Sequence, residues 1–134
     1  TEEAEPGLPL DDFDILLLVD PCRRWYNDGA SGTAPLMRGS FRQDFAAIAS
    51  QYERVCLLGA SMGGFGALSC ADLADAVLAF NPQIDLGSAM HRPGFDPEAF
   101  EQASAQLRWA VAHRRGSVEC HAAMDTHLSQ AKLL

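Results

Sequence analysis

Residues Gly59-Ala60-Ser61-Met62-Gly63 form the pattern G-x-S-x-G, in which a serine stands between two glycines. This pattern is typical of a serine on a sharp turn between a strand and a helix, where its Oγ attacks a carbonyl carbon. Such a turn strains the backbone of the serine and leaves no room for side chains two residues before and two residues after it. We therefore predict that Ser61 is a nucleophile and that the turn requires Gly59 and Gly63. The alternative is that Ser61 only caps the following helix.

The residues present exclude the other chemistries that glycine-rich loops serve. A P-loop needs Gly-Lys-Ser/Thr, whereas the one lysine in the chain is Lys132. The dinucleotide fingerprint G-x-G-x-x-G and the zinc motif H-E-x-x-H do not occur. The four histidines and four cysteines show no metal-ligand spacing. We expect no nucleotide, no cofactor and no metal.

Apolar runs and helical periodicities alternate along the chain on both sides of the serine. Phe13–Val19 is an almost continuous apolar run closed by Asp20-Pro21, typical of a strand buried on both faces. Asp96 and Pro97 begin a helix that ends at His113-Arg114-Arg115 before a glycine. Its predicted apolar stripe is Phe100, Ala103, Leu107 and Val111. The other predicted elements are helices over residues 40–52, residues 65–71 and from about Thr126, and strands over residues 54–58, 76–80 and 118–120.

Strands that alternate with helices of about three turns predict right-handed βαβ units. The expected fold is of the α/β class, with a mainly parallel sheet and helices on both faces. Residues 1–12 hold two prolines and five acidic residues, so they are expected to form a flexible leader before one domain over residues 13–134.

Composition and charge narrow the range of partners. The 134 residues are 48% hydrophobic and 21% charged, which is typical of one globular domain. Ten basic against 18 acidic residues give a net charge of −8, which would repel nucleic acid and anionic membrane surfaces. No apolar run approaches the roughly 20 residues that span a bilayer. The four cysteines form no C-x-x-C pair, which favours free thiols and a cytoplasmic location. The oligomeric state is left open.

Over residues 13–134 the chain resembles the α/β-hydrolase family, and the elbow Gly59–Gly64 is the specific part of that resemblance. It is similar, more narrowly, to a set of bacterial hydrolase-like proteins. The residues that carry this likeness are Asp20-Pro21 with Arg24-Trp25-Tyr26-Asn27, then Ser61 to Leu68, then Val77 to Gln83. The resemblance implies a serine hydrolase or acyltransferase, of esterase or thioesterase type, that acts on a small-molecule ester or acyl substrate without a cofactor.

The resemblance also implies roles for individual residues. Ser61 would be the acylated nucleophile, and the backbone N–H of Met62 would be one oxyanion donor. The second donor should come from the loop after Val19. Because Pro21 has no N–H, Cys22 or Arg23 is the first residue able to supply it.

The acid and the base of a triad are harder to assign. In the family the acid follows one of the later strands and the histidine follows the last strand. Asp125 occupies the first of these places, with Asp85 as the alternative, and His127 is the histidine of this chain that follows Asp125. Since about four strands are predicted, we expect the chain to be a fragment whose catalytic histidine lies beyond Leu134.

Two aromatic and two guanidinium side chains in the loop Arg23–Gly29 should rim the substrate pocket. Arg24, Trp25 and Tyr26 are the predicted substrate-binding residues, suited to a polar, carbohydrate or anionic acyl substrate. The alternative is that both aromatic residues cover the sheet edge. For the whole chain, the alternative function is a truncated or degenerate hydrolase-like domain that lacks catalysis and acts as a binding module.

Overall fold

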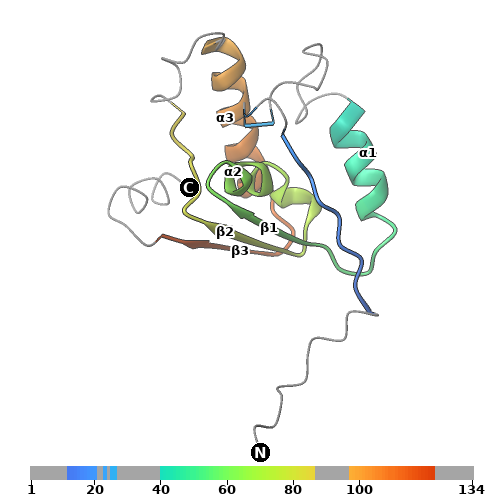
Figure 1. The fold of residues 1–134 in the computed structure, drawn as a ribbon. Coiled ribbons are helices and arrows are strands. Elements are labelled where there is room, and N and C mark those ends of the chain that lie inside the picture. The colour runs from blue at the N-terminus through green and yellow to red at the C-terminus, as the bar shows by residue number, and fades with distance from the viewer. Residues whose placement is uncertain (1–11, 21–22, 24, 27–39, 87–96, 123–134) are drawn as a thin grey trace, which may run out of the picture.

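A computed structural model of the chain describes residues 12–20, 23, 25–26, 40–86 and 97–122 (Figure 1). Helices and strands alternate over residues 40–86 and 97–122, as the βαβ pattern predicts. In chain order the elements are α1 (Ser40–Ala49), β1 (Cys56–Ala60), α2 (Met62–Leu68), the 3₁₀ turn η2 (Ala71–Leu73), β2 (Ala76–Phe80), α3 (Pro97–Ala112) and β3 (Ser117–His121).

The three strands form one parallel sheet in the order β1-β2-β3. Because the order in space is the order in the chain, both crossovers move across the sheet in the same direction. Right-handed crossovers of that kind place their helices on the same face, and Figure 1 shows α2 and α3 on one side of the sheet. The α/β class and the parallel sheet are therefore confirmed, whereas helices on both faces are wrong for the described residues.

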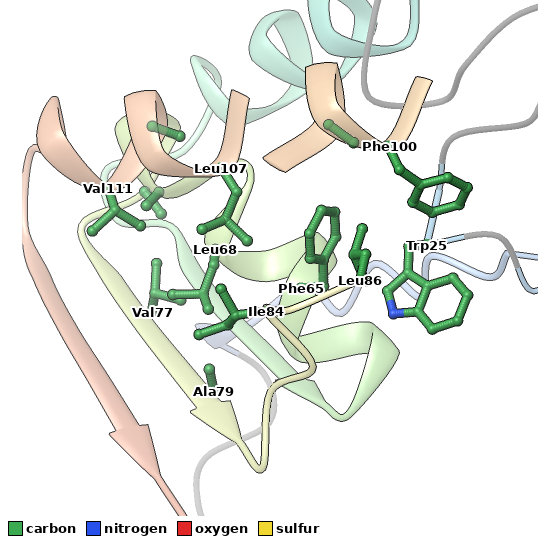
Figure 2. Close-up of a cluster of buried hydrophobic side chains, with 14 residues drawn as sticks. Trp25, Phe65, Leu68, Val77, Ala79, Ile84, Leu86, Phe100, Leu107 and Val111 are labelled. Atoms are coloured by element: carbon green, nitrogen blue, oxygen red, sulfur yellow. The ribbon is translucent and has the colours of Figure 1, made fainter. Parts of the chain in front are cut away.

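The main core lies between the central strand β2 and the helices α2 and α3 (Figure 2). Phe65 and Leu68 of α2 and Leu107 of α3 are fully buried against Val77 of β2. The apolar stripe of α3 repeats at helical spacing, as the sequence predicts, and faces this cluster. Its buried members are Phe100, Ala103, Leu107, Ala110 and Val111.

The opposite face of the sheet is open among the described residues. Side chains on this face are accessible to solvent: Leu58 of β1 is 69% exposed, and Phe80 of β2 is 41% exposed. The imidazole of His121 stacks on the Phe80 ring, with the ring centroids 5.1 Å apart. The alternation of covered and open residues along each strand follows from the two-residue period of a β-strand.

The predicted buried strand Phe13–Val19 is wrong. This segment has no regular secondary structure, and its apolar side chains are accessible, with Ile15 83% and Leu17 82% exposed. A two-sided apolar strand is stable only where a sheet pairs its backbone and layers cover both faces. Among the described residues the sheet ends at β1, and the open face offers no cover. A hydrogen bond holds this segment near α1: the Tyr52 hydroxyl donates to Asp14 Oδ2 at 2.7 Å.

Other boundaries differ by a turn or less. Helix α1 ends at Ala49 instead of reaching residue 52, and it buries Phe45 and Ala49 while Ile48 is exposed. Residues 1–11 of the leader predicted over residues 1–12 lie outside the described residues, as do the last predicted helix and Asp96. No helix within the described ranges has the length and apolar character needed to cross a membrane.

Candidate active site

Ser61 is the single residue between the end of β1 at Ala60 and the start of α2 at Met62. Its backbone has φ 52° and ψ −115°, a region that residues with a side chain rarely adopt and that costs roughly 1–3 kcal/mol. Its hydroxyl makes no capping hydrogen bond with α2, and the residue is exposed. The geometry therefore disfavours the helix-cap alternative, because a capping serine uses its Oγ and keeps an ordinary backbone.

Backbone hydrogen bonds fix this turn from both sides. The Ser61 N–H donates to the Phe80 carbonyl oxygen at 2.9 Å, which ties the turn to the end of β2. The Ser61 carbonyl oxygen accepts from Phe65 N–H and from Gln83 N–H, both at 3.2 Å. The strained residue is thus held by its own helix and by the segment that follows the neighbouring strand.

The glycines around Ser61 have different roles. A Cβ at Gly59 would lie 2.8 Å from Gly64 N and closer still to the Gly63 carbonyl, so Gly59 is required, as predicted. A Cβ at Gly63 would meet nothing nearer than Tyr26 Oη at 3.9 Å, among the described residues. Among the described residues the predicted steric need for Gly63 is therefore wrong, because its carbonyl faces Gly59 while a Cβ on it would make only an ordinary contact. The tight position is instead Gly64, whose Cβ would lie 3.0 Å from Pro82 Cβ.

Asn81-Pro82-Gln83 supports the turn in a way that sequence reasoning missed. Asn81 has a left-handed backbone with φ 42°, and its N–H donates to the His121 carbonyl at 2.7 Å. Pro82 is fully buried against the α2 glycine described above, and Gln83 N–H binds the Ser61 carbonyl. From the sequence, Asn81-Pro82 is predicted to end a strand and belongs to the family resemblance, but neither observation gives it a role at the serine. One sequence signal could have predicted this support. It is an Asn-Pro pair directly after the strand that follows the nucleophile turn.

The segment that precedes α1 contributes one aromatic residue to the core and one to the turn. Trp25 is 3% exposed, and its ring meets that of Phe100 edge to face at 6.0 Å, so it packs in the core rather than lining a pocket (Figure 2). Tyr26 is half-buried, and its hydroxyl is the group nearest to the Gly63 position. Asp20, 5% exposed, accepts a hydrogen bond from Tyr26 N–H at 2.9 Å. In the sequence, Asp20 marks the end of an apolar run and belongs to the family resemblance, and neither observation predicts its hydrogen bond to Tyr26. The predicted site residues Cys22 and Arg24 lie outside the described residues.

The described residues bring no imidazole to Ser61. His121 ends β3, two strand spacings or about 10 Å from the end of β1, and its Nε2 lies 3.4 Å from Glu119 Oε2. His113 lies after α3, where its Nδ1 is 2.8 Å from the Trp109 carbonyl oxygen. Asp85, the alternative acid, is exposed five residues after β2. The predicted pair Asp125 and His127 lies outside the described residues, so the structure does not place a triad.

Tyr26 is a residue near the turn whose pKa is shifted. Burial, and then the nearby carboxylate of Asp20, raise the pKa of the Tyr26 hydroxyl above its ordinary value. Its proton therefore stays in place at neutral and mildly alkaline pH. Within the described ranges, no three His, Cys, Asp or Glu side chains lie close enough together to hold a metal ion.

Comparisons of the chain with protein-family models, curated proteins and solved structures found no match. The chemistry of the site is therefore inferred from the geometry of its own residues.

Proposed function

We propose that the protein is a serine hydrolase or acyltransferase in which Ser61 attacks the carbonyl carbon of a small-molecule ester or thioester. The observation that carries this proposal is the backbone of Ser61, with φ 52° and ψ −115° and a hydroxyl that does not cap α2. Strain of this kind persists only where neighbouring contacts hold it, and it is concentrated at functional sites. Here three backbone hydrogen bonds and the packing of Gly59 and Pro82 hold it.

The proposed reaction has two halves. Ser61 Oγ bonds to the carbonyl carbon, a carbonyl electron pair moves onto its oxygen, and the serine proton passes to a general base. When the oxyanion collapses, the alcohol or thiol leaves with a proton, and water or another acyl acceptor then releases the acyl group from Ser61. Met62 is the first residue of α2, so its N–H has no acceptor within the helix and is the proposed backbone donor to the oxyanion.

For the base, the sequence offers His127, with Asp125 or Asp85 behind it. An unassisted serine hydroxyl is a weak nucleophile near neutral pH, so the reaction needs an imidazole from the protein or from the buffer. This requirement determines how the proposal has to be tested. The reaction is therefore compared in two buffers. One contains imidazole, which can act as the base, and the other does not.

The test is covalent labelling of the 134-residue chain by a fluorophosphonate, with the modified residue mapped by mass spectrometry. In this reaction Ser61 Oγ bonds to phosphorus, the phosphorus–fluorine bond breaks, fluoride leaves and the serine proton goes to the base. We expect labelling at Ser61 in imidazole buffer and none in Ser61→Ala. Ser69→Ala is the matched control, because Ser69 is a buried serine whose Oγ already donates to the Phe65 carbonyl at 2.8 Å.

The outcomes separate the candidate functions. Labelling without imidazole that is lost in His127→Ala would identify His127 as the base. Labelling only in imidazole would mean that the base is not supplied by this chain. If Ser61 stays unmodified in both buffers while the chain is folded by circular dichroism, the hydrolase proposal is wrong and the non-catalytic binding module is favoured.

A further inference from the structure

The Tyr26 hydroxyl lies beside the Ser61 turn. The point that a Cβ of Gly63 would occupy is in van der Waals contact with Tyr26 Oη at 3.9 Å, and no other described atom outside α2 lies within 4 Å of it. Gly63 is the second residue after Ser61 and lies in the first turn of α2. A group bound to Ser61 on this side of the turn would therefore lie next to the tyrosine hydroxyl.

The backbone of Tyr26 and of its neighbours in the chain is strained. Arg23, Trp25 and Tyr26 have φ of 52°, 54° and 61°. Each such residue costs roughly 1–3 kcal/mol, so their concentration in one short segment points to a functional requirement. Two anchors offset this cost. The buried Asp20 carboxylate accepts the Tyr26 N–H, and the Trp25 ring is buried against Phe100.

The Tyr26 hydroxyl is positioned to donate a hydrogen bond to a bound group. The ring is partly buried against Phe45 and Cys70, which fixes its direction. The hydrogen bond recorded for Tyr26 within the described ranges is made by its backbone N–H, and none is recorded for its hydroxyl. Tyr52, the other tyrosine of the chain, instead donates its hydroxyl to Asp14.

We propose that the Tyr26 hydroxyl, which lies beside Gly63, is a side-chain oxyanion donor of the Ser61 site and acts together with the Met62 N–H. This proposal rests on the proposed function. When the bond between Ser61 Oγ and the carbonyl carbon forms, negative charge collects on the carbonyl oxygen, and the Tyr26 O–H donates a hydrogen bond to that oxygen. No proton is transferred from Tyr26, since the serine proton goes to the general base. Burial and the Asp20 charge raise the pKa of Tyr26, which keeps this donor protonated over the working pH range.

The test compares the kinetics of fluorophosphonate labelling at Ser61 in imidazole buffer for the wild type and Tyr26→Phe. The phosphoryl oxygen of this probe occupies the place of the oxyanion. Removing one oxyanion donor typically costs 10²–10³ in rate, so we expect the maximal labelling rate of Tyr26→Phe to fall about 100-fold. The half-saturating probe concentration should not change, because the donor acts on developing charge and the phenyl ring keeps its packing.

Tyr52→Phe is the matched control, since it removes a hydroxyl that is hydrogen-bonded at the opposite end of β1. Its labelling rate should stay within about twofold of the wild type. Both variants are compared at a temperature where circular dichroism shows them folded.

Each other outcome overturns the proposal in a recognisable way. Equal labelling rates in Tyr26→Phe and the wild type would exclude the donor role and leave the Ser61 nucleophile standing. A change confined to the half-saturating concentration would make Tyr26 a binding residue only. Absence of Ser61 labelling in the wild type would overturn the oxyanion role and the proposed function together.

Discussion

Two glycines of the G-x-S-x-G pattern should respond to the same substitution with opposite signs. The pattern treats Gly59 and Gly63 as equivalent. Among the described residues, however, the turn around Ser61 leaves no room for a Cβ at Gly59 and accommodates one at Gly63 with an ordinary contact. Gly59→Ala and Gly63→Ala therefore form a matched pair. Both add one methyl group within the same five residues, so differences in composition or in the unfolded chain are small.

The expected size of the Gly59→Ala effect follows from the contacts of the added Cβ. It would lie 2.8 Å from Gly64 N, against roughly 3.5 Å for an unstrained contact, so the turn would have to open by roughly 0.7 Å at this atom and by more at the Gly63 carbonyl. All of these neighbours are backbone atoms, which cannot rotate away. Overpacking of this kind costs about 3 kcal/mol or somewhat more.

The substitution at Gly63 should instead stabilise the protein. Gly63 lies within α2, and alanine is the better helix former by about 0.5–1 kcal/mol. With roughly 3–5 °C of melting temperature per kcal/mol for a chain of this size, Gly59→Ala should lower the midpoint by roughly 10–15 °C. Gly63→Ala should raise it by a few degrees.

Thermal and urea unfolding followed by far-ultraviolet circular dichroism measure both effects, and an unchanged urea m-value confirms that the two-state comparison is valid. Equal destabilisation by the two substitutions would refute the steric reasoning and would favour the symmetric turn that the sequence pattern predicts. A Gly59→Ala protein as stable as the wild type would show that the turn between β1 and α2 is not this tight.

Three further substitutions probe strain, packing and titration. Ser61→Gly should raise the free energy of unfolding by about 1 kcal/mol, because glycine adopts φ 52° without a steric penalty, and an unchanged or lower value in urea unfolding would argue against strain at this residue. Gly116→Ala should lower the melting temperature by roughly as much as Gly59→Ala, since its Cβ would lie 2.8 Å from Asp75 Cα and closer still to the Asp75 carbonyl; a melting curve that matches the wild type contradicts this. Burial raises the pKa of Cys70 to about 11, so iodoacetamide at pH 8 should alkylate the exposed Cys56 much faster than Cys70. Because the folded pKa of Cys70 lies above the unfolded one, its contribution to stability is complete below about pH 9 and is lost between about pH 9 and 11. Cys70→Ala should therefore reduce the loss of stability over this range in urea titrations at several pH values.

The parts of the fold that the sequence predicted well are those whose signals are local. Strand β2 matches the predicted bounds because a short apolar run is stopped on its carboxyl side by Asn81-Pro82. Helix α3 begins at Pro97, and its buried stripe is the one that the helical period predicts. In both elements the residues that end the element stand next to the residues that form it.

The failures concern packing against distant elements. The run Phe13–Val19 has the composition of a buried strand, but composition does not state whether a neighbouring strand and two covering layers exist. The described helices α2 and α3 lie on one face instead of both for a related reason. The covered face depends on the order of strands in space, and the alternation of strands and helices does not specify that order.

For the site, the sequence located the turn but not its support. Ser61 stands between a strand and a helix, as the pattern predicts, and Gly59 is required because of the backbone of the residues after it. Gln83 binds Ser61 from 22 residues away, and Asp20 binds the backbone of Tyr26 through a turn of the same segment. The spacing of residue types in the sequence indicates neither hydrogen bond. Trp25 and Tyr26 look equivalent as neighbouring aromatic residues. The turn that joins them sends the Trp25 ring into the core and the Tyr26 hydroxyl toward Gly63.

Left-handed backbones follow two adjacent parallel strands, at Ser61 after β1 and at Asn81 after β2. The two positions are linked, because Ser61 N–H binds the carbonyl of Phe80 and Gln83 N–H binds the carbonyl of Ser61. A change of conformation at Asn81 would move Phe80 and Gln83, which stand on either side of it and bind Ser61, so it would break the hydrogen bonds that hold Ser61. The strain at Ser61 is therefore maintained by the pairing of β1 with β2, which is also the pairing on which the core depends. This coupling explains how a sheet with three described strands can hold an unfavourable serine in place, and why the substitutions that test the nucleophile also test the fold.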